Sequence, residues 1–163
     1  KSTLISRISR ARPKVADYPF TTLTPQLGVV SVDVDCSFVV ADLPGLIEGA
    51  ADGHGLGHQF LRHVERTRLF VFLITQDLDP ERNPVKDFNA LRFELEKYRA
   101  DLLTYPFICV LSQCDRPDVL DQAEDVKAAL GLDKLYTISS VTGFGIDHLV
   151  NEITRKLFSP DDD

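Results

Sequence analysis

Two uninterrupted apolar runs, LFVFLIT at residues 69–75 and FICVLS at residues 107–112, most constrain the fold of this chain. Runs of this kind are typical of strands that are buried on both faces of a sheet. Between them, residues 84–103 carry apolar side chains at steps of three and four, which predicts an amphipathic helix. A helix between two strands lets them run parallel, because a parallel pair needs a long crossover connection. We therefore expect an α/β sandwich with a mostly parallel sheet.

The remaining segments fit the same plan. Two Val-rich runs at residues 27–34 and 37–43, separated by a tight corner at Asp35-Cys36, predict one antiparallel pair. We also expect helices over 1–9, 58–66, 119–130 (ended by Gly131) and 145–158, a strand over 134–139 and a long loop over 10–26. Residues 159–163 are expected to form an acidic tail after a domain of residues 1–158. Ligands of such folds bind at the carboxyl ends of the strands, so the loops after 42, 75, 112 and 139 are the places to search.

Composition excludes several classes of function. The formal net charge of −7 gives no chain-wide basic footprint for nucleic acid. No apolar run is close in length to a membrane-spanning helix, which needs about 20 residues. Three cysteines without a C-x-x-C pair favour a reduced, cytoplasmic protein, which we expect to be a monomer. The chain has no methionine, even at position 1, which suggests a fragment of a longer protein.

The chain begins with Lys1-Ser2-Thr3 at the start of a predicted helix. In a phosphate-binding loop, a lysine at this place meets the β and γ oxygens, and the following hydroxyl binds Mg²⁺. An ordinary helix start also reads this way, so the tripeptide needs context. Context comes from the strand that ends in Asp42-Leu43-Pro44-Gly45, because a carboxylate there can hold the water shell of Mg²⁺ opposite Ser2. The hydroxyl of Thr22, in DYPFTTLTPQLG, can complete that shell in a triphosphate state.

Two later loops have features that suit a purine base. Asp115 ends the motif Ser112-Gln113-Cys114-Asp115 directly after a buried strand, and its carboxylate can accept the N1–H and N2–H of guanine. The turn Ser139-Ser140-Val141 follows the next strand, and its main-chain N–H groups can reach the base carbonyl. Each motif is weak by itself, and their order along the chain is the specific signal.

On these motifs, and above all on YPFTTLTPQLGVV and DLPGLIEGAADGHGLGHQFLRHVERT, the chain resembles the G domain of Obg family GTPases over essentially its whole length. The resemblance implies a P-loop NTPase-like three-layer sandwich from which the central first strand and the first half of the phosphate loop are missing. It implies a GTP or GDP site, Mg²⁺ and a monovalent cation such as K⁺. It also implies a role in ribosome assembly or the stress response, with the large ribosomal subunit or its RNA as the partner of the full-length protein.

The resemblance also implies which residues form the site. Ser2 and Thr22 would ligate the metal, with Asp42 acting through water. The implied nucleotide-binding residues are Lys1, Ser2, Thr3, Phe20, Thr21, Thr22, Leu23, Thr24, Asp42, Leu43, Pro44, Gly45, Ser112, Gln113, Cys114, Asp115, Ser139, Ser140 and Val141.

Two departures from the family pattern bear on function. The base motif of the family is Asn-Lys-x-Asp, in which the Asn bonds the base and ties loops together and the Lys stem packs over the base. Ser112 and Gln113 stand at these two positions here, which weakens the predicted guanine specificity. Leu46 follows Gly45, where many GTPases place a glutamine that orients water, so we assign no catalytic residue and expect slow, partner- or cation-stimulated hydrolysis. An ATP-binding or relaxed-specificity relative, or a module that does not hydrolyse nucleotide, remains open.

Overall fold

The computed structural model describes residues 2–9, 14–15, 26–41, 66–77, 79 and 81–158. The chain divides into two compact units, Lys1–Thr67 and Arg68–Asp163. Of the predicted helix over 58–66, all but Arg66 lies outside the described residues, as does the predicted tail at 159–163.

The first unit contains a helix and a small antiparallel sheet. Its elements are α1 (Ser2–Ile8), β1 (Lys14–Val15), β2 (Gln26–Asp33) and β3 (Cys36–Ala41), with the strand order β1-β2-β3. The antiparallel pair predicted from the Val-rich runs is confirmed, with Val30 opposite Phe38 and both side chains buried. Helix α1 packs closely on β2, because a Cβ atom at Gly28 would lie 2.8 Å from Cγ2 of Ile5.

Two predictions for this unit were wrong in detail. Residues Lys14 and Val15, expected in a loop, pair with Leu27 and Gln26 at the start of β2. The corner between the Val-rich strands lies at Val34-Asp35, and Cys36 already belongs to β3. At this corner, Oδ1 of Asp33 accepts the N–H of Val34 at 2.7 Å.

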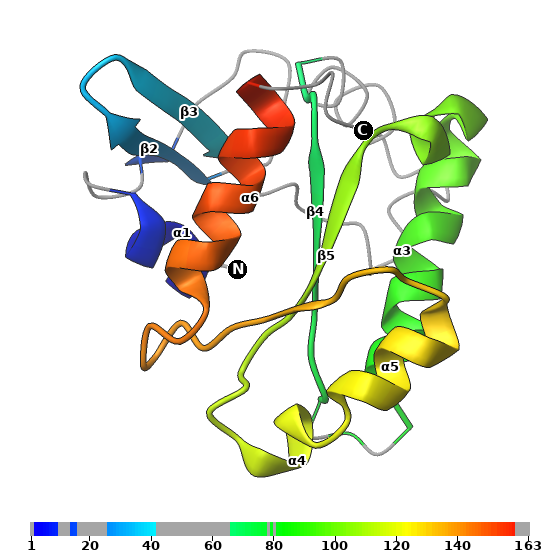
Figure 1. Cartoon of the computed structure of the whole chain (residues 1–163). Helices are drawn as coiled ribbons and strands as arrows, with labels where there is room; N and C mark the ends of the chain where they lie inside the picture. Colours follow the sequence, from blue (N-terminus) through cyan, green and yellow to red (C-terminus); the bar gives the residue numbers. More distant parts are fainter. Residues whose placement is uncertain are drawn as a thin grey trace. The chain divides into compact units, whose positions relative to one another are not determined.

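The second unit contains a parallel sheet in the order β4-β5-β6. Its elements are β4 (Phe70–Ile74), α3 (Pro84–Tyr98), the 3₁₀ helix η2 (Ala100–Thr104), β5 (Phe107–Leu111), α4 (Pro117–Leu120), α5 (Ala123–Leu130), β6 (Tyr136–Thr137) and α6 (Ile146–Phe158). Helices α3 and α6 lie on opposite sides of β4 and β5 (Figure 1). This layered α/β arrangement confirms the predicted fold class. Among the described residues, β3 and β4 belong to separate hydrogen-bonded sheets.

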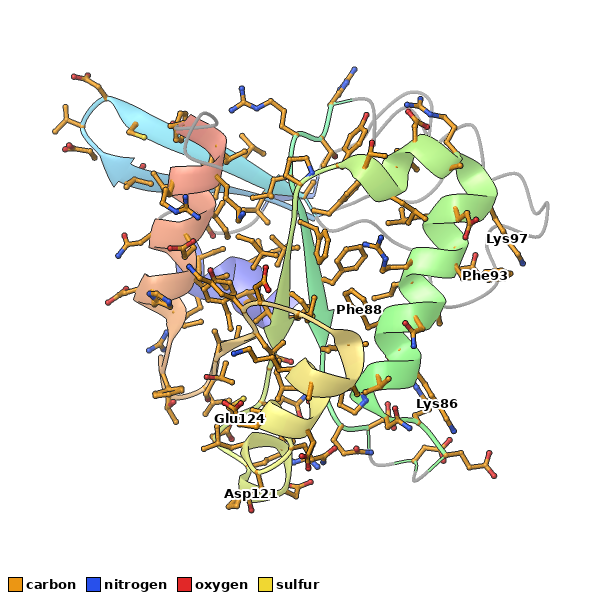
Figure 2. All side chains as sticks on the ribbon, turned by 45° about the vertical axis from the view of Figure 1, so that its right-hand side comes forward. Lys86, Phe88, Phe93, Lys97, Asp121 and Glu124 are labelled. Atoms are coloured by element: carbon orange, nitrogen blue, oxygen red, sulfur yellow. The ribbon has the colours of Figure 1, made fainter. Side chains whose placement is uncertain are left out.

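Aromatic and aliphatic side chains form the core between α3 and the parallel strands. Phe88 points from α3 toward the strands, whereas Lys86, Phe93 and Lys97 point away from them (Figure 2). The ring of Phe72 on β4 meets the rings of Phe88 and Phe107 edge-on, at centroid distances of 5.3 and 5.6 Å. Rings in this geometry stabilise one another beyond their burial.

Periodicity alone misplaced two helix boundaries. The helix predicted over 84–103 breaks at Arg99, which is extended (φ −160°, ψ 128°); its N–H donates to the carbonyl of Leu95, and its own carbonyl then starts η2. The helix predicted over 119–130 is divided into α4 and α5. Its predicted end is confirmed, because Gly131 adopts a left-handed φ of 64° and the N–H of Leu132 reaches the Lys127 carbonyl.

The prediction that both apolar runs are buried on both faces holds for one strand only. On β5, the residues from Ile108 to Leu111 are all buried. On β4, burial alternates, and Val71 is 37% exposed. An apolar run therefore shows that a strand belongs to the core, but it does not show that both of its faces are covered within the unit.

Candidate nucleotide-binding site

Three loops meet at the carboxyl ends of β4, β5 and β6. Parallel strands end at the same edge of a sheet, and the hydrogen bonds continue from the strands into the loops. The Ser112 N–H donates to the Ile74 carbonyl at 2.8 Å, and the Cys114 N–H donates to the Ile138 carbonyl at 2.9 Å. The hydroxyl of Thr75 adds a bond to the Ser112 carbonyl at 3.0 Å. The two base-reading motifs that the sequence predicts are therefore brought together, as expected.

A buried hydroxyl holds the Asp115 carboxylate. Ser139 is fully buried, and its Oγ donates to Oδ1 of Asp115 at 2.9 Å. The same Oγ accepts the N–H of Thr142 at 3.1 Å, which fixes the direction of its proton. Asp115 itself is exposed. The carboxylate is thus both anchored and accessible, and carboxylates accept hydrogen bonds only, so it suits a ligand edge with two donors.

The turn after β6 is closed by its own main chain. The Ser139 N–H donates to the Phe144 carbonyl at 2.9 Å, and the Gly143 N–H donates to the Ser139 carbonyl at 2.8 Å. The N–H of Ser139 is therefore engaged within the turn, and the prediction that main-chain N–H groups of this turn reach a base carbonyl rests on Ser140 and Val141. Within the described residues, no partner is found for the N–H groups of Ser140 and Val141, and Val141 is 74% exposed.

Gly145 is required where this turn ends. Its φ is 73°, and a Cβ atom there would lie 2.1 Å from the carbonyl oxygen of Thr137 on β6. No side chain fits at that distance. The contact places the start of α6 directly against the edge strand that carries the base turn.

The motif after β5 is divided between buried and exposed side chains. Gln113 is exposed and has a φ of 61°, the one positive value at a non-glycine residue in the part of the chain that is described. Cys114 is buried, and its thiol donates to the Leu111 carbonyl at 3.2 Å. Burial raises the pKa of the Cys114 thiol, which favours the protonated form over the nucleophilic thiolate.

The predicted phosphate and metal residues lie largely outside the described part. Ser2 and Thr3 form the start of α1, but the placement of their side chains is not described. The other residues outside the description are Lys1, Phe20, Thr21, Thr22, Leu23, Thr24, Asp42, Leu43, Pro44 and Gly45. Among the described residues, no three His, Cys, Asp or Glu side chains come together as a metal site. The described helices include none that is long and apolar enough to cross a membrane.

Sequence reasoning missed three residues that shape the site: Thr75, Gln76 and Arg116. Thr75 ties the loop after β4 to Ser112, and Arg116 bonds the main chain of Gln76. A signal was present, since Thr75 is the first polar residue after an apolar run and Arg116 directly follows Asp115, which the sequence predicts to contact a base. Which partners they bond depends on contacts between separate strands, and the chain order does not reveal those.

Solved structures define the class to which this fold belongs. The G domain of the T. maritima FeoB iron transporter matches with a TM-score of 0.67 and 20% identity, over 96% of this chain and 91% of that one. The GDP form I of the FeoB cytosolic domain matches with a TM-score of 0.69 and 20% identity, over 98% of this chain and 59% of that one. At such identities the likeness concerns the fold, which is that of P-loop GTPases.

Residues 1–113 match the family model described as 50S ribosome-binding GTPase, and the chain belongs to that family. The GTPase Obg of Syntrophomonas wolfei is 50% identical over 93% of this chain, and that of Myxococcus xanthus is 48% identical over 98%. The Obg resemblance read from the motifs is thereby confirmed. The chain spans 36% and 33% of the lengths of these two relatives.

Proposed function

We propose that this chain is the G domain of a GTPase that binds GTP, hydrolyses it slowly to GDP, and acts as a switch in ribosome assembly or the stress response. The observation that carries the proposal is the Asp115 carboxylate, anchored by the buried Ser139 hydroxyl at the carboxyl ends of three parallel strands. Guanine offers N1–H and N2–H side by side, whereas adenine presents no such pair of donors. The large ribosomal subunit or its RNA is the proposed partner of the whole protein, as the family description suggests.

The proposed phosphate and metal residues come from the sequence motifs. Lys1, Ser2 and Thr3 would bind phosphate oxygens, and Asp42 to Gly45 would respond to the γ-phosphate. The hydroxyls of Ser2 and Thr22, with Asp42 acting through water, form an all-oxygen donor set, which suits Mg²⁺. The ion would neutralise negative charge on the phosphates. Leu46, after Gly45, cannot orient a water by hydrogen bonding, so rapid hydrolysis would need a partner or a monovalent cation.

Base selectivity tests the proposal. In the intact protein, binding of fluorescent GDP, ADP and xanthosine diphosphate is measured by titration, with and without Asp115→Asn. GDP should bind more tightly than ADP. The substitution should lower the affinity for GDP by roughly 10- to 150-fold, because a hydrogen bond to a charged group contributes about 1.5–3 kcal/mol. The affinity for xanthosine diphosphate should rise in the Asp115→Asn variant, since xanthine presents an acceptor where guanine has its N2 amino group.

Equal affinity for ADP and GDP, unchanged by Asp115→Asn, would favour the ATP-binding or relaxed-specificity reading. Normal GDP selectivity without phosphate release in a single-turnover assay of the intact protein would favour a nucleotide-binding module. These two results are independent, because one reports on the base and the other on the γ-phosphate.

A further inference from the structure

The guanidinium of Arg116 joins two of the three loops at the site. Its Nη1 donates to the side-chain oxygen Oε1 of Gln113 at 2.9 Å and to the main-chain carbonyl of Gln76 at 3.1 Å. Its Nη2 forms an ion pair with Oδ2 of Asp118 at 2.7 Å. Arg116 therefore links the loop after β4 to the loop after β5, one residue beyond the proposed base reader Asp115.

Gln113 is a residue whose position needs support. Its left-handed φ of 61° is unfavourable for a residue with a Cβ atom. Its side chain is exposed, and a free glutamine side chain would sample several rotamers. The bond from Arg116 Nη1 to Oε1 restrains the far end of this side chain, two residues before Asp115 in the chain.

Gln113 presents a neutral acceptor to the positively charged Arg116. Arg116 has donors only, and the contact on Nη1 is a carbonyl-type oxygen at 2.9 Å. A lysine at 113 would bring a second positive charge to the same group. Asp118 bonds the other nitrogen, Nη2, and does not replace the acceptor that Nη1 would lose. Residues 113 and 116 are therefore matched to each other by charge.

We propose that Arg116 is the positioning residue of the base-binding loop, and that it holds the Gln113 stem as a platform for the face of the purine ring. The proposal rests on the function proposed above. A platform contacts the ring face, which guanine and adenine share, whereas Asp115 contacts the edge that differs. Loss of Arg116 therefore lowers the affinities for GDP and ADP by a similar factor and leaves the ratio of the two affinities unchanged.

A double-mutant cycle in the intact protein tests this role. Arg116→Ala and Gln113→Ala should each weaken the binding of fluorescent GDP by about two- to tenfold, the fold-change that corresponds to the net contribution of one hydrogen bond. The double variant should be no weaker than either single variant, because both remove the same platform. Asp118→Ala is the matched control: it removes the Nη2 partner, keeps both bonds of Nη1, and should leave GDP affinity unchanged.

A charge swap adds a readout that a purely structural role would not move. Gln113→Lys should bind GDP less tightly with Arg116 present than in the double variant Gln113→Lys/Arg116→Gln, where the repulsion is gone. Thermal melting of every variant shows that each is folded.

Additive losses from Arg116→Ala and Gln113→Ala, or tighter binding by Gln113→Lys when Arg116 is kept, would overturn the role of Arg116 while the guanine site stands. A protein that binds ADP and GDP equally would instead overturn the proposed function, and failure to bind either would overturn both.

Discussion

The buried Ser139 hydroxyl should contribute measurably to both stability and base selectivity. Ser139→Ala removes the 2.9 Å bond to Asp115 and the acceptor for the Thr142 N–H. A hydrogen bond to a charged group contributes about 1.5–3 kcal/mol. Because Asp115 and Thr142 are both exposed, water can replace part of these bonds, and we expect the lower end of the range, about 1.5 kcal/mol. The alanine leaves only a small void, since it removes a single oxygen atom.

The loss should appear in two assays on the intact protein. The melting temperature should fall by about 3–6 °C, as expected for a domain of this size. If the hydroxyl chiefly orients the carboxylate, GDP affinity should fall by up to about tenfold, which corresponds to about 1.4 kcal/mol. The affinity for ADP should change less, because adenine does not use both carboxylate oxygens.

Ser140→Ala is the matched control for this prediction. It removes the same atom one residue further along, where no hydroxyl bond is found within the described residues, and it keeps the main-chain N–H through which Ser140 is expected to contact the base. It should leave both the melting temperature and GDP affinity close to those of the unsubstituted protein. The reasoning is refuted if the two alanine variants behave alike, or if Ser139→Ala lowers the affinities for GDP and ADP equally.

Two further predictions concern stability. In denaturant unfolding, Gly145→Ala should lower the free energy of unfolding far more than Gly131→Ala. Both glycines have a positive φ, which costs about 1–2 kcal/mol for alanine. Only at position 145 would the new Cβ atom meet Thr137, whereas at position 131 it meets nothing within 4 Å. Similar losses would show that the Thr137 contact relaxes freely. Burial, followed by a hydrogen bond to Glu152, raises the pKa of Tyr136 from 10.0 to about 12. Its neutral form therefore stabilises the folded state fully below pH 10, and this contribution is lost as the pH rises from 10 to 12. Tyr136→Phe should reduce the loss of stability between pH 10 and 12. An unchanged dependence of the free energy of unfolding on pH would contradict the raised pKa of Tyr136.

The sequence predicts the elements whose pattern is long and regular. The apolar run of β5 and the amphipathic stripe of α6 were placed within a residue or two, because burial imposes the pattern along the whole element. The break at Arg99 was not predictable, since the apolar spacing continues through it to the buried Leu102. Strand β1 was also missed, because two residues are too few to form a period.

The candidate site also has features that could be predicted from the sequence and features that could not. The chain order showed that Asp115 and Ser139 follow neighbouring strands, so their proximity could be predicted. It did not show that the Ser139 N–H is used inside its own turn, or that Arg116 spans from Gln113 to the main chain of Gln76. Such bonds depend on how turns close and on which loops lie side by side, and neither leaves a periodic trace in the sequence.

The loops after β5 and β6, which we propose to contact the base, both lie within the unit Arg68–Asp163. Their mutual bonds, from Cys114 to Ile138 and from Ser139 to Asp115, are internal to that unit. If the proposed function is correct, the choice of nucleobase is therefore determined within one stretch of about a hundred residues. Evolution or an engineer could retune this chain toward a different base by editing that stretch alone, while Ser2 and Thr3 at the start of α1 stay as they are.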